Sequence, residues 1–226
     1  MAHVRQIEDF FQKHKGRSAC VLGNGPSLLD HDLESLRKEH VFIGINKSWT
    51  VVQSSYHCFV AREHFVDLCE GKYSPGERHG DEFVPGVVFC TSGNAHEGRT
   101  RWLEAWQGQL VVLSPSQRLG DQVWWSADMS GGRYHSPWGG AFALELAAWM
   151  GLSPVYLLGY DAHNNEGHHW DTGPMHGVDR RKQIAFLKPV AAYLEQAGVE
   201  VFNANPKSAI RWFPFKSPAK QEPCSS

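Results

Sequence analysis

Short apolar runs alternate along this chain with longer segments in which apolar and polar positions recur at helical spacing. Runs of four or five apolar residues are typical of parallel strands buried on both faces, whereas the helical spacing indicates helices that pack on such a sheet. We therefore expect strands at 18–22, 41–45, 56–60, 87–90, 110–113, 154–158 and 199–202. Helices are expected at 4–14 on the surface and at 30–38, 64–70, 140–150 and 179–197, the last kinked at Pro189.

This alternation predicts an α/β fold with a Rossmann-like, doubly wound, mostly parallel sheet and helices on both faces. Residues 1–215 are expected to form one domain, and the Ser, Pro and Lys residues of 216–226 predict a disordered tail. Segments 121–139, rich in Trp, and 164–177, rich in His, are expected to form a small lid region. In such sheets ligands bind outside the carboxyl ends of the strands, so residues that follow each strand are expected to line one crevice.

Composition narrows the class of protein. The 226 residues are 42% hydrophobic and 20% charged, as in ordinary globular proteins, and a net charge of −2 argues against a nucleic-acid binder. Five cysteines without a CxxC pair, and no apolar leader, predict a cytoplasmic protein. Glu145, Gly151 and Pro154 interrupt the longest apolar stretch, so no membrane span is expected.

The most specific motif follows the first strand directly: Gly23, Asn24, Gly25, Pro26 and Ser27. Glycines at a strand end permit positive φ and close backbone approach, and the free N–H groups with the Ser27 hydroxyl can bind phosphate oxygens. The motif has neither GxGxxG spacing nor the GK[ST] of a P-loop, so it predicts neither a dinucleotide nor the usual NTPase geometry. The alternative is a tight structural turn.

Other strand ends carry polar residues as well. Asn46 ends the second strand and can hydrogen-bond a ribose, phosphate or base, although Asn is also common in turns. Arg62 follows the third strand, and Tyr160 and Asp161 follow the strand at 154–158. All four are expected at the same crevice.

A glycine-containing segment precedes the apolar helix at 140–150. Gly139 and Gly140 at the helix start offer unpaired N–H groups to an anion, with Ser136 close by in sequence. Arg133 can pair with a carboxylate or phosphate. The alternative is a flexible loop that leads into a helix.

Histidines cluster between the last two strands. His163, His168 and His176 belong to a stretch of sixteen residues with four His and two Asp. One of them can act as a general base near neutral pH. Two alternatives stay open: a solvated polar loop, and a metal site that lacks any HExxH-like spacing.

Taken in order, these motifs resemble the bacterial lipooligosaccharide sialyltransferases and the superfamily of hydroxymethylpterin pyrophosphokinase-like proteins that share the GNGPS turn. The resemblance rests on the GNGPSL turn, Asn46, the Ser/Gly segment before the apolar helix, Leu158-Gly-Tyr-Asp161, and a His ahead of a long helix, and it spans residues 18–209. It implies one Rossmann-like domain with a lid, a CMP-sialic-acid donor, inversion without a metal or other cofactor, and a homo-oligomer.

The resemblance also implies roles for single residues. Asn24 to Ser27 would hold the donor, and Asn46 would contact it from the second strand. His176 would be the general base, while His163 and His168 stand where the family has lid tyrosines that assist departure of the phosphate. Arg133 and Ser136 fall near the family's Arg and Thr-Ser-Gly motif.

The sequence therefore predicts a metal-independent inverting glycosyltransferase that uses a nucleotide-activated sugar and an unknown acceptor. One alternative is a pterin-type pyrophosphokinase that uses ATP and Mg²⁺. That enzyme needs an acidic cluster, for which Asp128, Asp161 and Asp171 are the candidates, with no adjacent pair at a strand end. The other alternative is a non-catalytic nucleotide-binding module.

Overall fold

The structure is a computed structural model of the chain, and it describes residues 3–60, 62–70, 86–91, 106, 108–116, 125–136, 138–162 and 180–218. Its strands are β1 (His3–Val4), β2 (Ala19–Leu22), β3 (Val41–Ile45), β4 (Tyr56–Phe59), β5 (Val87–Thr91), β6 (Gln109–Pro115), β7 (Arg133–Tyr134), β8 (Val155–Leu158) and β9 (Val201–Asn203). Its α-helices are α1 (Leu33–Glu39), α2 (Arg62–Glu70), α4 (Gly139–Trp149) and α5 (Arg180–Gln196).

The strands form one parallel sheet in the order β1-β6-β5-β4-β3-β2-β8-β9, and the short β7 pairs with β6. From β2 the chain winds outward through β3, β4, β5 and β6, and it returns through α4 to the other side of β2, where β8 and β9 lie. This reversal confirms the predicted doubly wound α/β sheet. In register, Leu22 lies between Gly44 of β3 and Leu158 of β8, so β2 and β8 end at the same level and β3 ends one residue further on.

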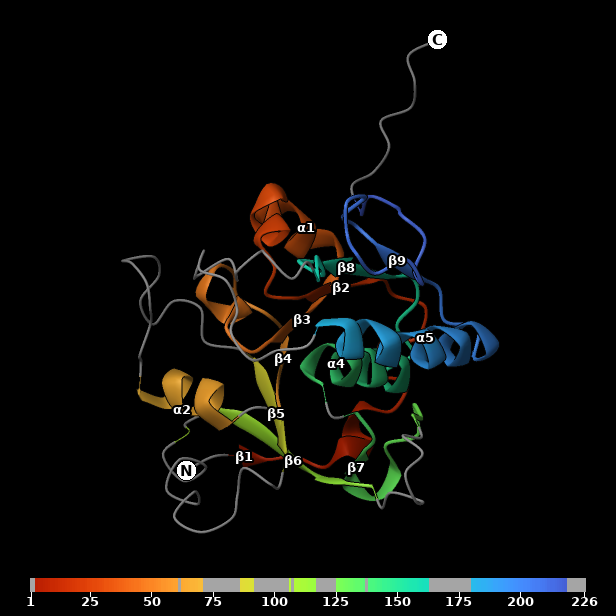
Figure 1. Cartoon of the computed structure of the whole chain (residues 1–226). Helices are drawn as coiled ribbons and strands as arrows, with labels where there is room; N and C mark the ends of the chain where they lie inside the picture. Colours follow the sequence, from red (N-terminus) through yellow and green to blue (C-terminus); the bar gives the residue numbers. More distant parts are fainter. Residues whose placement is uncertain are drawn as a thin grey trace.

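Helices cover both faces of the sheet, and strand side chains alternate between two apolar cores (Figure 1). Ala19 and Val21 of β2 face the core beneath α4 and α5, which lie side by side. Cys20 and Leu22 face the core beneath α1. All four side chains are fully buried, which explains why this strand reads as an unbroken apolar run.

The expected surface helix at 4–14 is wrong. Residues 3–4 form β1, which pairs with β6, and only Ile7–Phe10 form a single short 3-10 helix. Phe10 is fully buried and meets the rings of Tyr56 and Phe89 edge-on, and Gln12 has a φ of +53° that ends any helix. Tertiary burial of an aromatic residue therefore overrides the helical spacing.

The remaining boundaries shift by small amounts. The helix expected at 30–38 begins at Leu33, because the Asp32 carboxylate accepts the Ser35 N–H and caps it. Pro189 lies inside α5. At the other end of the chain, the first residues of the expected tail are docked, because the Lys216 N–H donates to the Asn203 carbonyl and His40 contacts the Pro218 carbonyl.

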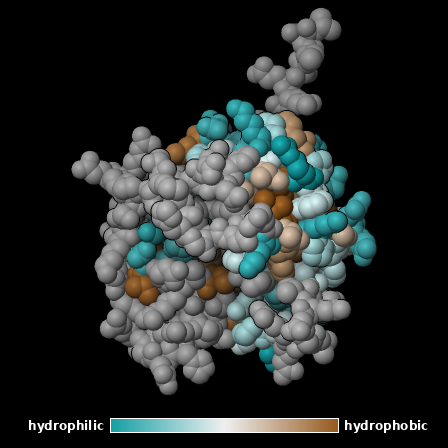
Figure 2. Space-filling model, viewed as in Figure 1, coloured by the Kyte–Doolittle hydropathy of each residue, from teal (hydrophilic) through white to brown (hydrophobic). Residues whose placement is uncertain are grey.

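The surface of the described part carries scattered apolar side chains. On the face seen in Figure 2, hydrophobic residues show as small separate patches among hydrophilic ones. The exposed large hydrophobic residues are Val4, Phe11, Leu29, Trp138, Trp212 and Phe215. No helix among the described residues is long and apolar enough to cross a membrane.

Candidate functional site

The glycine-rich turn after β2 packs directly onto the end of β8. The Gly23 and Gly25 N–H groups donate to the carbonyls of Leu158 and Gly159 at 2.7 and 2.8 Å. A Cβ on Gly23 would lie 2.5 Å from the Gly159 oxygen, and a Cβ on Gly25 would collide with the Asp161 carboxylate. Gly25 has a φ of −72°. The glycines therefore serve close packing between two strand ends, whereas positive φ, which the sequence also allowed, is not used.

Asp161 binds this turn to the rest of the sheet edge. Its carboxylate is 3% exposed and accepts the Ser27 N–H at 3.0 Å, the Ser27 hydroxyl and the Asn205 amide. The sequence assigned the N–H and hydroxyl of Ser27 to phosphate oxygens. In the structure the Asp161 carboxylate takes that place, because a buried anion needs several donors to be stable.

The segment after β9 completes this edge, and the sequence analysis missed it. Asn205 reaches Asp161, and the Ser208 hydroxyl donates to the Tyr160 carbonyl at 2.5 Å. The sequence held a signal for these residues, since residues that follow the strand at 199–202 are expected at the carboxyl edge of the sheet just as those that follow the other strands are.

Asn46 lies at the end of β3, beside the start of α4. It has a φ of +49°, and a Cβ placed on Gly139 would lie 3.6 Å from its Oδ1 atom. That oxygen is buried and has no hydrogen-bond partner among the residues that the structure describes. An unpaired buried acceptor is costly, so Asn46 is ready to accept a hydrogen bond from a ligand N–H or O–H group. The neighbouring Lys47, which the sequence offered as extra charge, pairs with Asp67 at 3.1 Å.

The first turn of α4 begins without a hydrogen bond from its N-cap side chain. Its N-cap residue is Trp138, whose side chain makes no capping hydrogen bond and is 37% exposed. Gly139 and Gly140 therefore begin a helix without a side-chain cap, where N–H groups and the helix dipole favour an anion. The Tyr160 hydroxyl donates to the Gly140 carbonyl at 3.0 Å and ties this turn to the end of β8. Ser136 is fully buried, and its Oγ has no hydrogen-bond partner within the described part of the chain.

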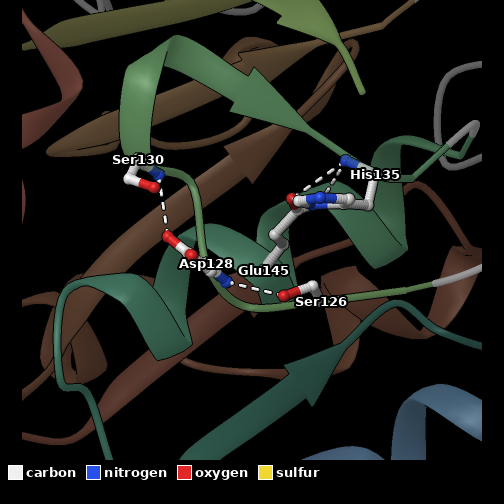
Figure 3. A network of polar contacts seen from close by, with 5 residues as sticks. All are labelled: Ser126, Asp128, Ser130, His135 and Glu145. Atoms are coloured by element: carbon white, nitrogen blue, oxygen red, sulfur yellow. Dashed lines mark hydrogen bonds and ion pairs between the residues drawn. The ribbon is translucent and has the colours of Figure 1, made fainter. Parts of the chain in front are cut away.

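A buried carboxylate on α4 anchors the segment that leads into the helix (Figure 3). Glu145 is the one charged residue of α4 and is fully buried. It accepts the His135 N–H at 2.9 Å, lies 2.7 Å from His135 Nδ1, and is also hydrogen-bonded by the Ser136 backbone. Burial raises the pKa of Glu145 against the opposing effect of these bonds. In the same view, Asp128 bridges Ser126 and Ser130.

The structure separates some predicted residues from this region. Arg133 lies on β7, next to β6 and four strands from β2, and it donates to the Pro115 carbonyl at 3.3 Å. Arg62 begins α2, and its side chain lies outside the described part of the chain. The three predicted catalytic residues, His163, His168 and His176, also lie outside the described residues.

Two further expectations concern the lid and a metal. Of the Trp-rich segment, Trp125 is buried against Tyr193 of α5, with ring centroids 4.9 Å apart, so it is a core residue. Trp138, the N-cap residue of α4, is the exposed one of its two described tryptophans. Within the described residues, no group of three His, Cys, Asp or Glu side chains is placed to hold a metal ion.

No family model and no curated protein sequence matches the chain. The structure is similar to a variant of the sialyltransferase CST-II in complex with CMP, with a TM-score of 0.53, 13% identity, and coverage of 89% of this chain and 86% of that one. CstII from Campylobacter jejuni with the substrate analogue CMP-3FNeuAc gives a TM-score of 0.51 at 13% identity over the same shares.

A second glycosyltransferase has a similar structure. The MAf glycosyltransferase from Magnetospirillum magneticum AMB-1 gives a TM-score of 0.56 at 16% identity, over 94% of this chain and 36% of that larger one. These comparisons show the fold: the chain has the α/β fold of these glycosyltransferases over 89–94% of its length. At identities of 13–16%, the similarity concerns the fold and does not extend to the substrate.

Proposed function

We propose that this chain is a metal-independent inverting glycosyltransferase that uses a nucleotide-activated sugar of the CMP-sialic-acid type. The observation that carries the proposal is the likeness to CMP-bound sialyltransferases over 89% of the chain. The open polar groups at the carboxyl edge of the sheet support it, because substrates of doubly wound folds bind at that edge. The acceptor is left open, and a nucleotide-sugar donor is the partner that the site is proposed to bind.

The described groups suggest a division of roles toward such a donor. The uncapped start of α4 at Gly139 and Gly140 suits the anionic phosphate or carboxylate, because helix N–H groups point there without a neutralising side chain. Asn46 Oδ1 suits a donor group, such as a ribose hydroxyl or a cytosine amine. Trp138 offers an exposed ring on which a base or sugar can stack.

The chemistry needs a base and a way to stabilise the leaving phosphate. His176 is proposed as the general base that takes the proton of the acceptor hydroxyl. His163 and His168 are proposed to donate to the departing phosphate. Of the other predicted binding residues, Asn24, Gly25 and Pro26 are proposed to present backbone to the donor. Ser27 and Asp161 hold the glycine-rich turn in place, and Tyr160 holds the first turn of α4. Arg62 and Arg133 are proposed to contribute positive charge toward the carboxylate or phosphate of the donor.

Nucleotide specificity tests the proposal first. Thermal shift of the whole chain with CMP, CDP, UDP and ATP, each with and without Mg²⁺, separates the functional classes, because a ligand of the native state raises the melting temperature by mass action. We expect stabilisation by CMP without metal, weakened in Asn46→Ala. Stabilisation by ATP only with Mg²⁺ would overturn the proposal and support the pyrophosphokinase alternative.

Catalysis requires a separate test. Sugar transfer from CMP-sialic acid to a panel of glycan acceptors should disappear in His176→Ala while CMP affinity stays nearly unchanged, since a base acts in the chemical step rather than in donor binding. His135→Ala is not a fair control, because its bond to Glu145 anchors the segment that leads into α4, so His40→Ala, at the amino end of β3 and away from the carboxyl edge, serves instead. Undiminished transfer in His176→Ala would remove that residue from the mechanism.

A further inference from the structure

His57 is a buried histidine that none of the motifs in the sequence marks. It lies on β4, is fully buried, and packs against the ring of Phe59. Its Nε2 lies 2.9 Å from the Asn46 carbonyl and its Nδ1 lies 3.1 Å from the Ser54 hydroxyl. A carbonyl only accepts, so Nε2 carries the proton and Nδ1 accepts from Ser54. Burial lowers the pKa of His57 to about 3, and the ring therefore stays neutral in this one tautomer.

The backbone around His57 is built to admit the ring. Gly44 lies opposite His57 in the β3–β4 register. A Cβ on Gly44 would collide with His57 Nδ1 and would lie 2.6 Å from Cε1. A glycine in the middle of a strand is unfavourable, and here it is explained by the space that the imidazole needs.

Asn46 depends on β4 for its conformation. Its φ of +49° is a left-handed value, which residues with a side chain adopt rarely and Asn adopts more readily than most. Both backbone groups of Asn46 are held by β4: the N–H donates to the Cys58 carbonyl at 3.2 Å, and the carbonyl accepts from His57. This conformation directs the carboxamide toward Gly139 at the start of α4.

We propose that His57 is a positioning residue that holds Asn46 in its left-handed conformation, so that donor binding depends on His57 although the ring touches no ligand. The inference rests on the proposed function in taking Asn46 as a donor contact. It adds the residue that holds the backbone conformation of Asn46. Ser54 and Gly44 act through His57, the first by fixing its tautomer and the second by making room for it.

A double-mutant cycle with CMP as the probe tests this dependence in the full chain. His57→Phe fills the site but donates no hydrogen bond, and we expect the Kd for CMP to rise about tenfold, the size of a lost buried donor. His57→Gln keeps a donor and an acceptor and should recover most of the affinity. In an Asn46→Ala background, His57→Phe should have no further effect, since His57 acts through Asn46. Additive losses, or an unchanged Kd in His57→Phe, would overturn the proposal.

Two controls separate positioning from general loss of stability. Val88→Ala shortens a fully buried side chain that lies opposite His57 in the β4–β5 register, on the side of β4 away from Asn46, and should lower stability without changing the Kd for CMP. Should His57→Phe not fold, Ser54→Ala provides a milder change with the same expected direction and the same dependence on Asn46. Loss of affinity in Val88→Ala equal to that in His57→Phe would make the effect structural and refute the inference.

A ligand-free measurement keeps this inference distinct from the proposed function. The three-bond coupling between the amide and α protons of Asn46, read by NMR in ¹⁵N-labelled protein, reports its φ. It should change in His57→Phe and stay native in His57→Gln. Wild-type protein that binds no CMP defeats the proposed function, and the coupling still decides the role of His57. An unchanged coupling in His57→Phe refutes that role by itself.

Discussion

Gly23 and Gly25 lack side chains because the end of β8 occupies the space that a Cβ would need. The same reasoning applies to Gly44, whose missing Cβ admits the His57 ring. At these positions glycine is therefore required because a neighbouring strand leaves no room for a side chain, and not because the backbone adopts a positive φ. Asp161 and His57 contribute the complementary polar groups, each buried and each with its hydrogen bonds made inside the protein.

Gly23→Ala should destabilise the protein by about 1–3 kcal/mol, since the new methyl group must push apart two packed strand ends. Urea unfolding at pH 7 measures the change. Gly139→Ala is the matched control, because a Cβ there meets the Asn46 amide at 3.6 Å, an ordinary contact. Equal stability of the two variants would contradict the close packing of the turn on β8.

The depressed pKa of His57, about 3, predicts a pH dependence of stability. Below pH 6.5 the unfolded chain protonates this side chain while the folded protein does not, so the free energy of unfolding falls as the pH is lowered from about 6.5 toward 3, by up to roughly 1.4 kcal/mol per pH unit. Chemical unfolding of wild type and His57→Gln between pH 7 and 4 isolates this contribution. The variant should lose less stability on acidification, and parallel curves would count against a neutral buried His57.

At the scale of elements, α4 connects the sheet with the candidate crevice. Its side chains pack against β2, β3, β4 and α5, and its first turn lies beside Asn46 and Tyr160. The helix is apolar all round apart from Glu145, as expected for a helix buried on every side. Glu145 links it to His135 and Ser136 and thereby fixes how the chain enters the first turn.

Glu145→Leu should cost about 3 kcal/mol, because it leaves two buried N–H groups and the His135 ring without their acceptor. Glu145→Gln should cost less, since its amide oxygen still accepts from the backbone. Urea unfolding gives the totals, and hydrogen exchange of the His135 and Ser136 amides locates the change. Unaltered exchange at these two amides in Glu145→Leu would show that the carboxylate does not anchor the segment.

At the scale of the whole molecule, the chain reverses direction between β2 and β8, the place where doubly wound sheets usually open a crevice. Here the glycine turn, Ser27 and Asp161 fill that place. The open polar groups lie one strand further, between the end of β3 and the start of α4. Residues 204–218 follow β9, at the opposite edge of the sheet from β1. Asn205 contacts Asp161, and the Pro218 carbonyl contacts His40.

Removal of residues 216–226 should lower stability by about 1–2 kcal/mol, because the hydrogen bonds of Lys216 to Asn203 and of Pro218 to His40 are lost. Removal of 219–226 is the matched control, since the sequence predicts a disordered tail there. Thermal melts of the two truncated chains against the full chain measure the difference. Identical melting temperatures would mean that the docked residues 216–218 contribute nothing.

The sequence by itself determined the architecture. Apolar runs such as 19–22 and 41–45 are buried on both faces of the sheet, so the sequence shows that they are strands without reference to the strands they pair with. Their alternation with helices predicts a doubly wound sheet. The rule that ligands bind at the carboxyl ends of the strands placed Asn46 at that edge. Local spacing failed at 4–14, where burial of Phe10 decided the outcome.

Only the tertiary structure decided which polar groups at that edge are used internally and which stay open. The Ser27 hydroxyl binds Asp161, more than a hundred residues away in the chain, and no local pattern reports such a pairing. The roles of His57, Glu145 and Asn205 likewise depend on contacts between elements. Strand composition follows from burial, which a sequence records, whereas hydrogen-bond partners follow from the three-dimensional register of strands, which it does not.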